Sequence, residues 1–201
     1  MLVSRRPAEH ELTTDYHRGH LNRVSGDDVI VVLRDQLPWL CDTVAAISTD
    51  LVDSIQAPYS WTIRQVFAHL AETERLMGYR LMCFAAGDPA TLPGLDENQY
   101  AAAKYGLGNF TNLVEELGLL RRSNILLLQR LRPACWDMMG AAENHTISVR
   151  GLAWVVAGHL QHHLQIVQQR LEIESPMDGC HDCQQRTVSQ CALTQCAQKP
   201  L

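Results

Sequence analysis

The chain has 201 residues, of which 46% are hydrophobic and 19% are charged, and its formal net charge is −5. This length is enough for one domain with a filled core. The small negative charge gives no argument for binding nucleic acid or an anionic membrane, and no apolar run reaches the roughly 18 to 20 residues of a membrane span. The N-terminus lacks the apolar region of a signal peptide, so we expect a cytoplasmic protein whose partner is a small molecule or another protein. Self-association as a homodimer stays open.

The first 24 residues are polar and show no sustained period, which predicts an extended N-terminal arm. This arm contains His10, His17 and His20. Two interpretations stay open for these histidines: an accessory metal site, or solvated and loosely packed side chains, of which the second is favoured.

The first long helix is predicted from Ser25 to about Ser48, because Ser25 and Asp28 offer a cap and an acidic first turn. Pro38 should kink or split this helix, since proline lacks the N–H that the helical hydrogen bond needs. A second helix is predicted after Thr62, and its apolar positions recur at helical spacing as far as Phe84.

Residues 87–110 are rich in Gly, Pro and Asn, and this long connection is predicted to be a crossover or a lid over a site. Thr111 can cap a third helix that runs to about Leu131. The fourth helix is predicted from Ser148, its cap, to about Glu172. Within the second helix, Thr62 and Gln65 have capping-box spacing.

Four long helices with one long crossover, and no hairpin signal, predict an all-α fold built as a four-helix bundle. The predicted organisation is an N-terminal arm over residues 1–24, the bundle over residues 25–174 and a Cys-rich tail over residues 175–201. Cys180 and Cys183 in the tail have a spacing found in zinc and redox sites, but Cys191 and Cys196 do not complete a recognisable zinc finger. A flexible appendage is therefore favoured, and the odd number of cysteines indicates mostly reduced thiols.

The fourth helix carries two histidines, His159 and His163, on an otherwise apolar face. Residues four apart stack one turn above each other, so both imidazoles are predicted to point into the bundle. Taken alone, the pair could be metal ligands or core histidines satisfied by hydrogen bonds. His162 is expected to one side of the pair, either as a group that supports the ligands or as a rim residue.

Three stretches, SWTIRQVFAHLAETERLMGYR (60–80), GDPATLPGLDENQYAA (87–102) and TISVRGLAWVVAGHLQHHLQI (146–166), resemble the DinB-like, or DinB/YfiT-like, metalloenzyme superfamily. The resemblance covers roughly residues 20–172. It implies a four-helix bundle that binds a divalent metal through one histidine of the second helix and an i, i+4 pair of the fourth. The matching residues here are His69, His159 and His163.

Three neutral imidazoles suit Zn²⁺, Ni²⁺ or a similar ion, and they leave a coordination position for water or substrate, which is typical of catalytic sites. Glu72 follows His69 by three residues and is a candidate general base, with an exposed carboxylate paired to Arg75 as the alternative. Glu74, Arg80 and Arg150 are expected in ion pairs that pack helices, and Trp61 and Trp154 in the core or the wall of a pocket.

The resemblance favours a thiol S-transferase, in which the metal activates a low-molecular-weight thiol cosubstrate that attacks a small-molecule electrophile. A metal-dependent hydrolase is the close alternative, because the same open position can activate water. The third alternative is a non-catalytic helical stress-response binding module whose metal is structural or absent. Charge and aromatic patterning give no support to nucleic-acid binding.

Overall fold

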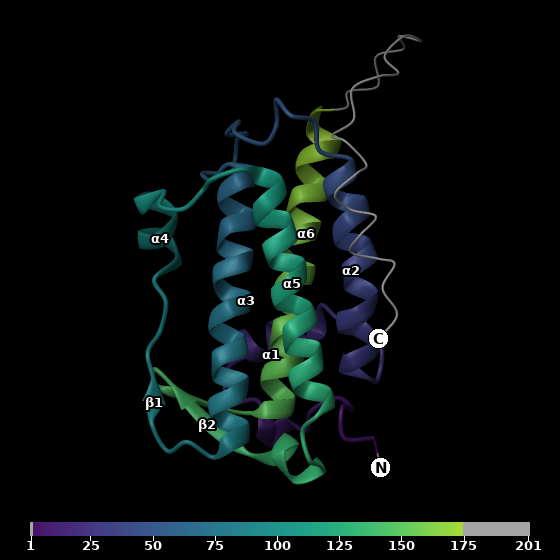
Figure 1. Cartoon of the computed structure of the whole chain (residues 1–201), viewed down its shortest axis with the longest axis vertical. Helices are drawn as coiled ribbons and strands as arrows, with labels where there is room; N and C mark the ends of the chain where they lie inside the picture. Colours follow the sequence, from purple (N-terminus) through teal and green to yellow (C-terminus); the bar gives the residue numbers. More distant parts are fainter. Residues whose placement is uncertain (1, 175–201) are drawn as a thin grey trace.

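Four long helices lie side by side and form the body of the protein (Figure 1). The structure is a computed structural model, and it describes residues 2–174. The bundle consists of α2 (Val29–Ala45), α3 (Ile63–Ala86), α5 (Phe110–Gln129) and α6 (Val149–Glu174). The predicted four-helix bundle is therefore confirmed. The Cys-rich tail and its predicted alternatives lie outside the described residues.

Two of the predicted helix caps are present. The Thr62 side chain accepts from the backbone N–H of Gln65, and the Gln65 side chain accepts from the backbone N–H of Thr62, which completes the capping box of α3. At the start of α6, the backbone N–H of Gly151 donates to Ser148 Oγ at 2.9 Å. Both side chains satisfy N–H groups that have no partner inside the helix.

The other two caps differ in part from the prediction. Asp28, the last residue of the stretch predicted to cap the first long helix, caps α2, and Asn109, and not Thr111, caps α5. Asp and Asn are among the best N-cap residues, and each directly precedes the first helical residue, whereas Ser25 lies four residues before α2 and Thr111 lies inside α5. Helix α2 also continues through Pro38, so the predicted split does not occur.

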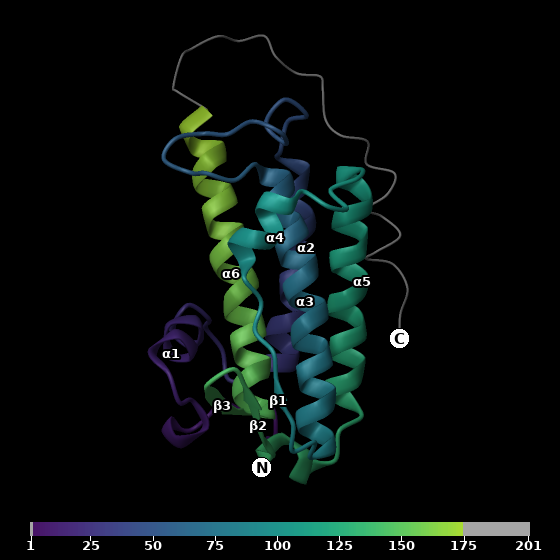
Figure 2. The ribbon, with the colours of Figure 1, turned by 90° about the vertical axis from the view of Figure 1, so that its left-hand side faces the viewer.

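Residues 1–24 were predicted to be extended, and this is wrong for part of the segment. Glu9–Glu11 form a short 3-10 helix, and Asp15–Asn22 form α1, which packs along α6 (Figure 2). A helix of eight residues is too short to be stable alone or to show a clear period. It is held by tertiary contact at Gly158, where an added Cβ would lie 2.2 Å from the carbonyl oxygen of His20.

A small sheet, which the sequence analysis did not predict, closes one end of the bundle. Its order is β1 (Thr91–Leu92), β2 (Met139–Ala142) and β3 (His145–Ser148), with β1 parallel to β2 and β2 antiparallel to β3. The strands are two to four residues long, too short for an alternating pattern to stand out in the sequence. The sheet holds together both segments that connect helices at this end.

The connection between α3 and α5 is the predicted long crossover. It contains β1 and then α4 (Glu97–Ala103), and it runs along the outside of α3 (Figures 1 and 2). The Asp96 carboxylate caps α4 by accepting from the N–H groups of Asn98 and Gln99. Gln65 in the first turn of α3 donates to the carbonyl of Ala101 in α4, so this short helix lies beside the N-terminal part of α3 (Figure 1).

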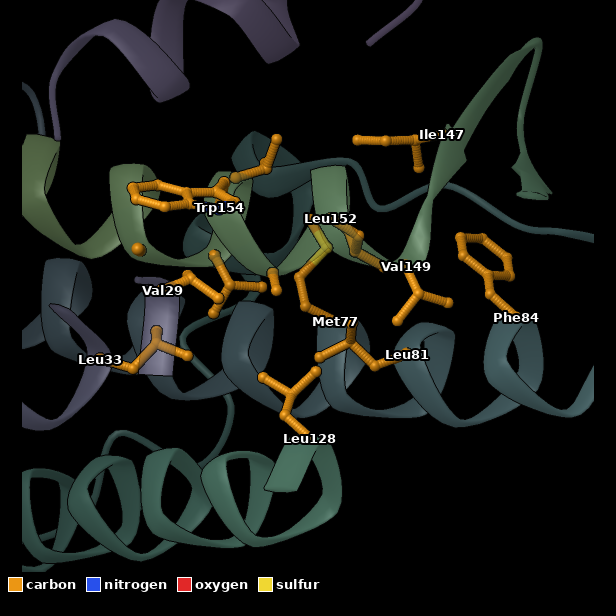
Figure 3. Packing of buried hydrophobic residues seen from close by; sticks show 14 of the residues in the cluster. Val29, Leu33, Met77, Leu81, Phe84, Leu128, Ile147, Val149, Leu152 and Trp154 are labelled. Carbon is orange, nitrogen blue, oxygen red and sulfur yellow. The ribbon is translucent and has the colours of Figure 1, made fainter. Parts of the chain in front are cut away.

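The core consists of buried apolar side chains from all four long helices and the sheet. Figure 3 shows one end of it, where Met77 and Leu81 of α3 meet Leu152 of α6 and Leu128 of α5. Burying each such side chain contributes about 1.5 to 3 kcal/mol. Within residues 2–174, no helix combines the length and the apolar character needed to cross a membrane.

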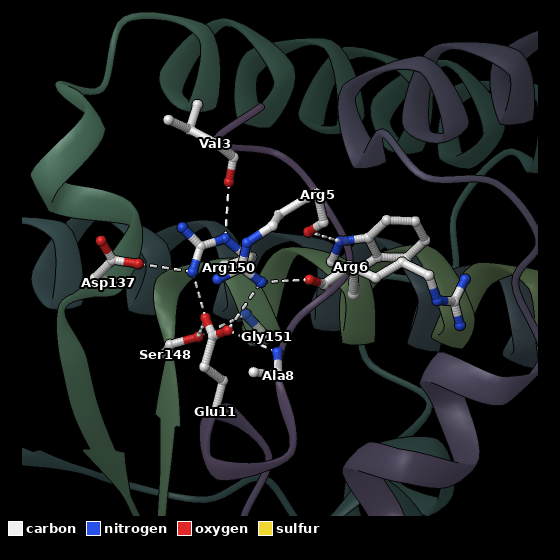
Figure 4. Close-up of polar contacts among 10 residues, drawn as sticks. Val3, Arg5, Arg6, Ala8, Glu11, Asp137, Ser148, Arg150 and Gly151 are labelled. Carbon is white, nitrogen blue, oxygen red and sulfur yellow. Dashed lines mark hydrogen bonds and ion pairs between the residues drawn. The ribbon is translucent and has the colours of Figure 1, made fainter. Parts of the chain in front are cut away.

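Two buried ion pairs connect elements across this core. Glu74 of α3 pairs with Arg121 of α5 at 2.8 Å, and both side chains are almost fully buried. Arg150 of α6 pairs with Glu11 in the N-terminal segment, where Ser148 also donates to the Glu11 carboxylate (Figure 4). The expected packing roles of Glu74 and Arg150 are confirmed.

Candidate metal centre

Three histidines from two helices meet inside the bundle. His69 comes from α3, and His159 and His163 come from successive turns of α6. The ring centroids are 5.0 Å apart for His69 and His159, 4.9 Å for His69 and His163, and 4.6 Å for His159 and His163. One ring nitrogen from each residue lies within 4.8 Å of the others.

The spacing of these nitrogens suits a first-row metal ion. Nε2 of His69 and Nε2 of His159 are 3.1 Å apart. An ion bound tetrahedrally at 2.0 to 2.1 Å separates its nitrogen ligands by about 3.3 to 3.4 Å. The nitrogens of His69 and His159 are therefore already close to the separation that such an ion requires, and the ligand nitrogen of His163 lies within 4.8 Å of both. The three residues fit a divalent ion with an open coordination position.

Burial keeps the imidazoles neutral. It lowers the pKa of His69 from 6.5 to about 4 and is the largest cause of the fall in the pKa of His163 to about 3. Burial, followed by the charge of His163, also lowers the pKa of His159 well below its ordinary value. Only the neutral imidazole has a lone pair for a metal, so the site is ready to bind at neutral pH.

A carboxylate that the sequence analysis did not single out lies beside the histidines. Glu97 Oε2 is 3.7 Å from His69 Nε2, and its side chain is 55% exposed. Glu97 is the first residue of α4, directly after the cap Asp96, so the crossover brings it to the site. The prediction of a crossover or lid at 87–110 was the signal that could have found it.

Glu72, the candidate base predicted from the sequence, does not lie beside the histidines as Glu97 does. It is hydrogen-bonded to Tyr105, and its predicted alternative partner, Arg75, pairs instead with Glu116 at 2.5 Å. Glu72 does not line either of the two cavities, described below, that reach the histidines. Trp61 is closer to the site, because its ring packs edge-on against His69 with centroids 5.3 Å apart.

Other histidines surround the three but do not form a second cluster. His20 of α1 has its ring 5.7 Å from that of His159 and 6.2 Å from that of His162. His17 lies 6.3 Å from His145 of β3. Across residues 2–174, His69, His159 and His163 are the one group of metal-binding side chains that is close enough for an ion, so the accessory site from His10, His17 and His20 is not formed.

Two cavities open onto the histidines from different sides. The larger, of about 490 Å³, reaches His69 and His159 and extends between α3, α6 and the sheet. The smaller, of about 310 Å³, reaches His159 and His163 between α1 and α6. Tyr16, Glu97 and His159 line both cavities. The candidate site is therefore accessible along two routes that meet at one place.

The contacts of Arg80 differ from those predicted. It was expected in an ion pair that packs helices, but none of the described carboxylates lies within 4.0 Å of its guanidinium, which instead lines the larger cavity. Its Nη2 donates to the backbone carbonyl of Pro93 at 2.6 Å. The sequence pattern does not show which group the guanidinium of Arg80 meets.

Comparison with known proteins identifies the class to which this bundle and site belong. The family model of the DinB superfamily matches residues 32–167, about two thirds of the chain, and the protein belongs to this superfamily. The resemblance found in the sequence motifs is thereby confirmed. No curated protein matched the chain.

Among solved structures, the chain is similar to YfiT from Bacillus subtilis, described as a probable metal-dependent hydrolase with an unusual four-helix bundle topology. The two are 17% identical, with a TM-score of 0.60, and the match covers 86% of this chain and 99% of YfiT. At this level of identity the likeness supports the fold, and the chemistry has to be argued from the site itself.

Proposed function

We propose that the protein is a divalent-metal-dependent enzyme that transfers a low-molecular-weight thiol to a small-molecule electrophile. His69, His159 and His163 would hold the ion, with Zn²⁺ or Ni²⁺ as the first candidates for three imidazole ligands. When bound, the ion would supply a Lewis acid that stabilises the thiolate.

The observation that carries this proposal is the meeting of two cavities at the histidines. A transfer reaction brings two organic molecules to one place, whereas hydrolysis needs one organic substrate and water. The larger cavity has room for the electrophile and the smaller one for the thiol, within the range of volumes typical of ligand sites. Tyr16 and Glu97 line both cavities and so contact both molecules.

Glu97 is proposed as the residue that accepts the thiol proton. Its carboxylate lies 3.7 Å from His69 Nε2, at the boundary between the cavities, and remains exposed enough to pass the proton to solvent. A positioned base of this kind typically contributes 10² to 10⁴ in rate. The buried apolar side chains of Phe84 and Leu152 form part of the wall of the larger cavity.

Metal-dependent hydrolysis is the second candidate. The same Glu97 could accept a proton from water, and YfiT is described as a probable metal-dependent hydrolase. Incubating the metal-loaded full-length protein with a panel of thiols and an electrophile separates the two reactions. Product formation that requires the thiol supports transfer, and substrate consumption without any thiol would support hydrolysis and overturn transfer.

Two carboxylate variants decide which residue is the base. Glu97→Gln should lower kcat by at least about 100-fold while metal content is unchanged. Glu72→Gln is the matched control, because Glu72 is one turn from His69 but is hydrogen-bonded to Tyr105. The opposite result, with a loss only in Glu72→Gln, would restore the base predicted from the sequence. No product with any thiol or electrophile, in a protein that keeps its metal, would favour the non-catalytic binding module.

A cytoplasmic location is part of this proposal, because the cytoplasm keeps small thiols reduced. The substrate is proposed to be a small molecule and not nucleic acid, and a homodimer stays a prediction that sedimentation or light scattering would test.

A further inference from the structure

Arg80 and His69 lie on the same side of α3. They are eleven residues apart, which in an α-helix corresponds to a rotation of about 20° beyond three full turns and a separation of about 16 Å along the axis. Both line the larger cavity, and Thr73 and Met77 line it between them. One face of α3 therefore carries a metal-binding group at one end of the cavity and a cation at the other.

The Arg80 guanidinium has an incomplete set of partners. The Arg80 residue is only 9% exposed, and Nη2 donates to the carbonyl of Pro93. Nη1 has a contact of 4.0 Å with the sulfur of Met77, which is a weak acceptor, and Nε is buried without a partner among the described residues. The arginine is thus a buried cation with no carboxylate of the described residues within 4.0 Å, although Glu143 lies near enough to act on its charge.

Such an arrangement is costly unless a ligand completes it. Guanidinium groups stay protonated in proteins, and a buried charge normally has a partner of opposite sign. Here the neighbouring walls are Phe84, Ile147 and Leu152, which are buried and apolar. In contrast, the buried Arg121 and Arg150 both have carboxylate partners within 3 Å.

We propose that Arg80 binds a carboxylate of the small molecule that occupies the larger cavity, at the end away from the three histidines. The binding itself is independent of the metal, whereas the statement that this molecule is the electrophilic substrate rests on the proposed function. The substrate class would then be an elongated acid, with its reactive group at the histidines and its carboxylate at Arg80.

A monoanion fits better than a phosphate. Three exposed carboxylates, of Asp96, Glu97 and Glu143, also line the larger cavity and would repel a second negative charge. Asp96 is already engaged as the cap of α4. Glu143 acts on the Arg80 charge most directly, and it lies at the turn between β2 and β3, where it packs over Gly94.

The test uses hexanoate and hexanamide, which have the same chain length but differ in charge. Binding to the full-length protein, with and without Zn²⁺, is measured by NMR titration. We expect hexanoate to bind about tenfold more tightly than hexanamide, because a charge-assisted hydrogen bond is about twice as strong as a neutral one. In Arg80→Met this preference should disappear, while hexanamide binding is unchanged, and Arg80→Lys should keep part of it.

Glu143→Gln is the control in the opposite direction, since removing a competing carboxylate should raise hexanoate affinity about threefold.

Absence of a preference for hexanoate over hexanamide in the unmodified protein would overturn the proposal. Equal losses of both ligands in Arg80→Met would also overturn it, because they would mean that Arg80 only holds Pro93 in place. Tighter binding of hexyl phosphate than of hexanoate would overturn the choice of a carboxylate. A hexanoate preference without thiol-dependent activity would leave the subsite standing and reject the proposed transfer.

Discussion

Helix α6 contributes to two buried polar clusters that differ in how well they are satisfied. Near its start, Arg150 donates to the Glu11 carboxylate and to the backbone carbonyl of Val3, and Ser148 completes the group (Figure 4). About two and a half turns later, His159 joins His69 and His163, where His69 Nδ1 is buried and has no partner among the described residues. The first cluster fastens the N-terminal segment to the bundle, and the second opens onto two cavities.

This difference shows how structural and functional polar groups can be told apart. Buried polar groups usually have their hydrogen bonds made within the protein, since leaving one unmade costs about 1 to 3 kcal/mol. The Arg150 cluster follows this rule and needs no ligand. The histidine cluster does not follow this rule, because it leaves a buried nitrogen without a partner next to an open cavity. This is expected of side chains that bind a ligand.

The largest expected effect comes from breaking the satisfied cluster. Arg150→Met would leave the buried Glu11 carboxylate with only the more distant Arg5, at 3.2 Å, so we expect the free energy of unfolding to fall by about 3 kcal/mol. Arg75→Met is the control, because the ion pair of Arg75 and Glu116 is exposed and should be worth less than about 1 kcal/mol. Urea denaturation measures both. If the free energy of unfolding fell by a similar, small amount in Arg150→Met and Arg75→Met, the buried Arg150 cluster would contribute no more stability than an exposed ion pair.

Acid should weaken the protein through the histidine cluster. The pKa of His69 is about 4 in the folded chain and 6.5 when unfolded, so on acidification the unfolded chain binds the proton first. Stability is therefore full above pH 6.5 and falls between pH 6.5 and 4, by about 1.4 kcal/mol per pH unit for each histidine that protonates only on unfolding. Urea denaturation of the metal-free protein at pH 7 and pH 5 measures this, and equal stability at the two values would contradict it.

A smaller effect is expected where α1 meets α6. In Gly158→Ala, the new Cβ would collide with the backbone of His20, so α1 must shift, at a cost of about 1 to 3 kcal/mol. The smaller cavity lies between these helices and should change with them. Gly19→Ala, whose added Cβ meets no atom within 4 Å, is the control for thermal melting only, because Gly19 lines the smaller cavity. Thermal melting and thiol affinity are the measurements. If Gly158→Ala keeps the thiol affinity of the unmodified protein, α1 does not shape the smaller cavity.

The sequence was sufficient to predict the parts of the fold that repeat over many residues. The apolar positions of the long helices, the capping box at Thr62 and Gln65, and the cap at Ser148 all follow from local rules. The resemblance to the superfamily supplied the link between His69 and the α6 pair. These signals do not require knowledge of which segments meet in space.

The remaining parts depend on contacts between distant segments. Helix α1 is stable because Gly158 lets it approach α6, and Glu97 reaches His69 because the crossover carries α4 alongside α3. Arg80 was expected in an ion pair, but its actual partner, the carbonyl of Pro93, could not be inferred from helical spacing. Short elements and single long-range contacts leave little periodic signal in a sequence.

Elemental analysis of the purified full-length protein and of His163→Ala tests the central claim most directly. We expect about one equivalent of a divalent metal in the unmodified protein and little or none in the variant, with the metal-free fold of both intact. A variant truncated after Glu174 should keep the full amount, which assigns the metal to the bundle and not to the tail. A folded protein without metal, or an equal metal content in His163→Ala, would contradict the account.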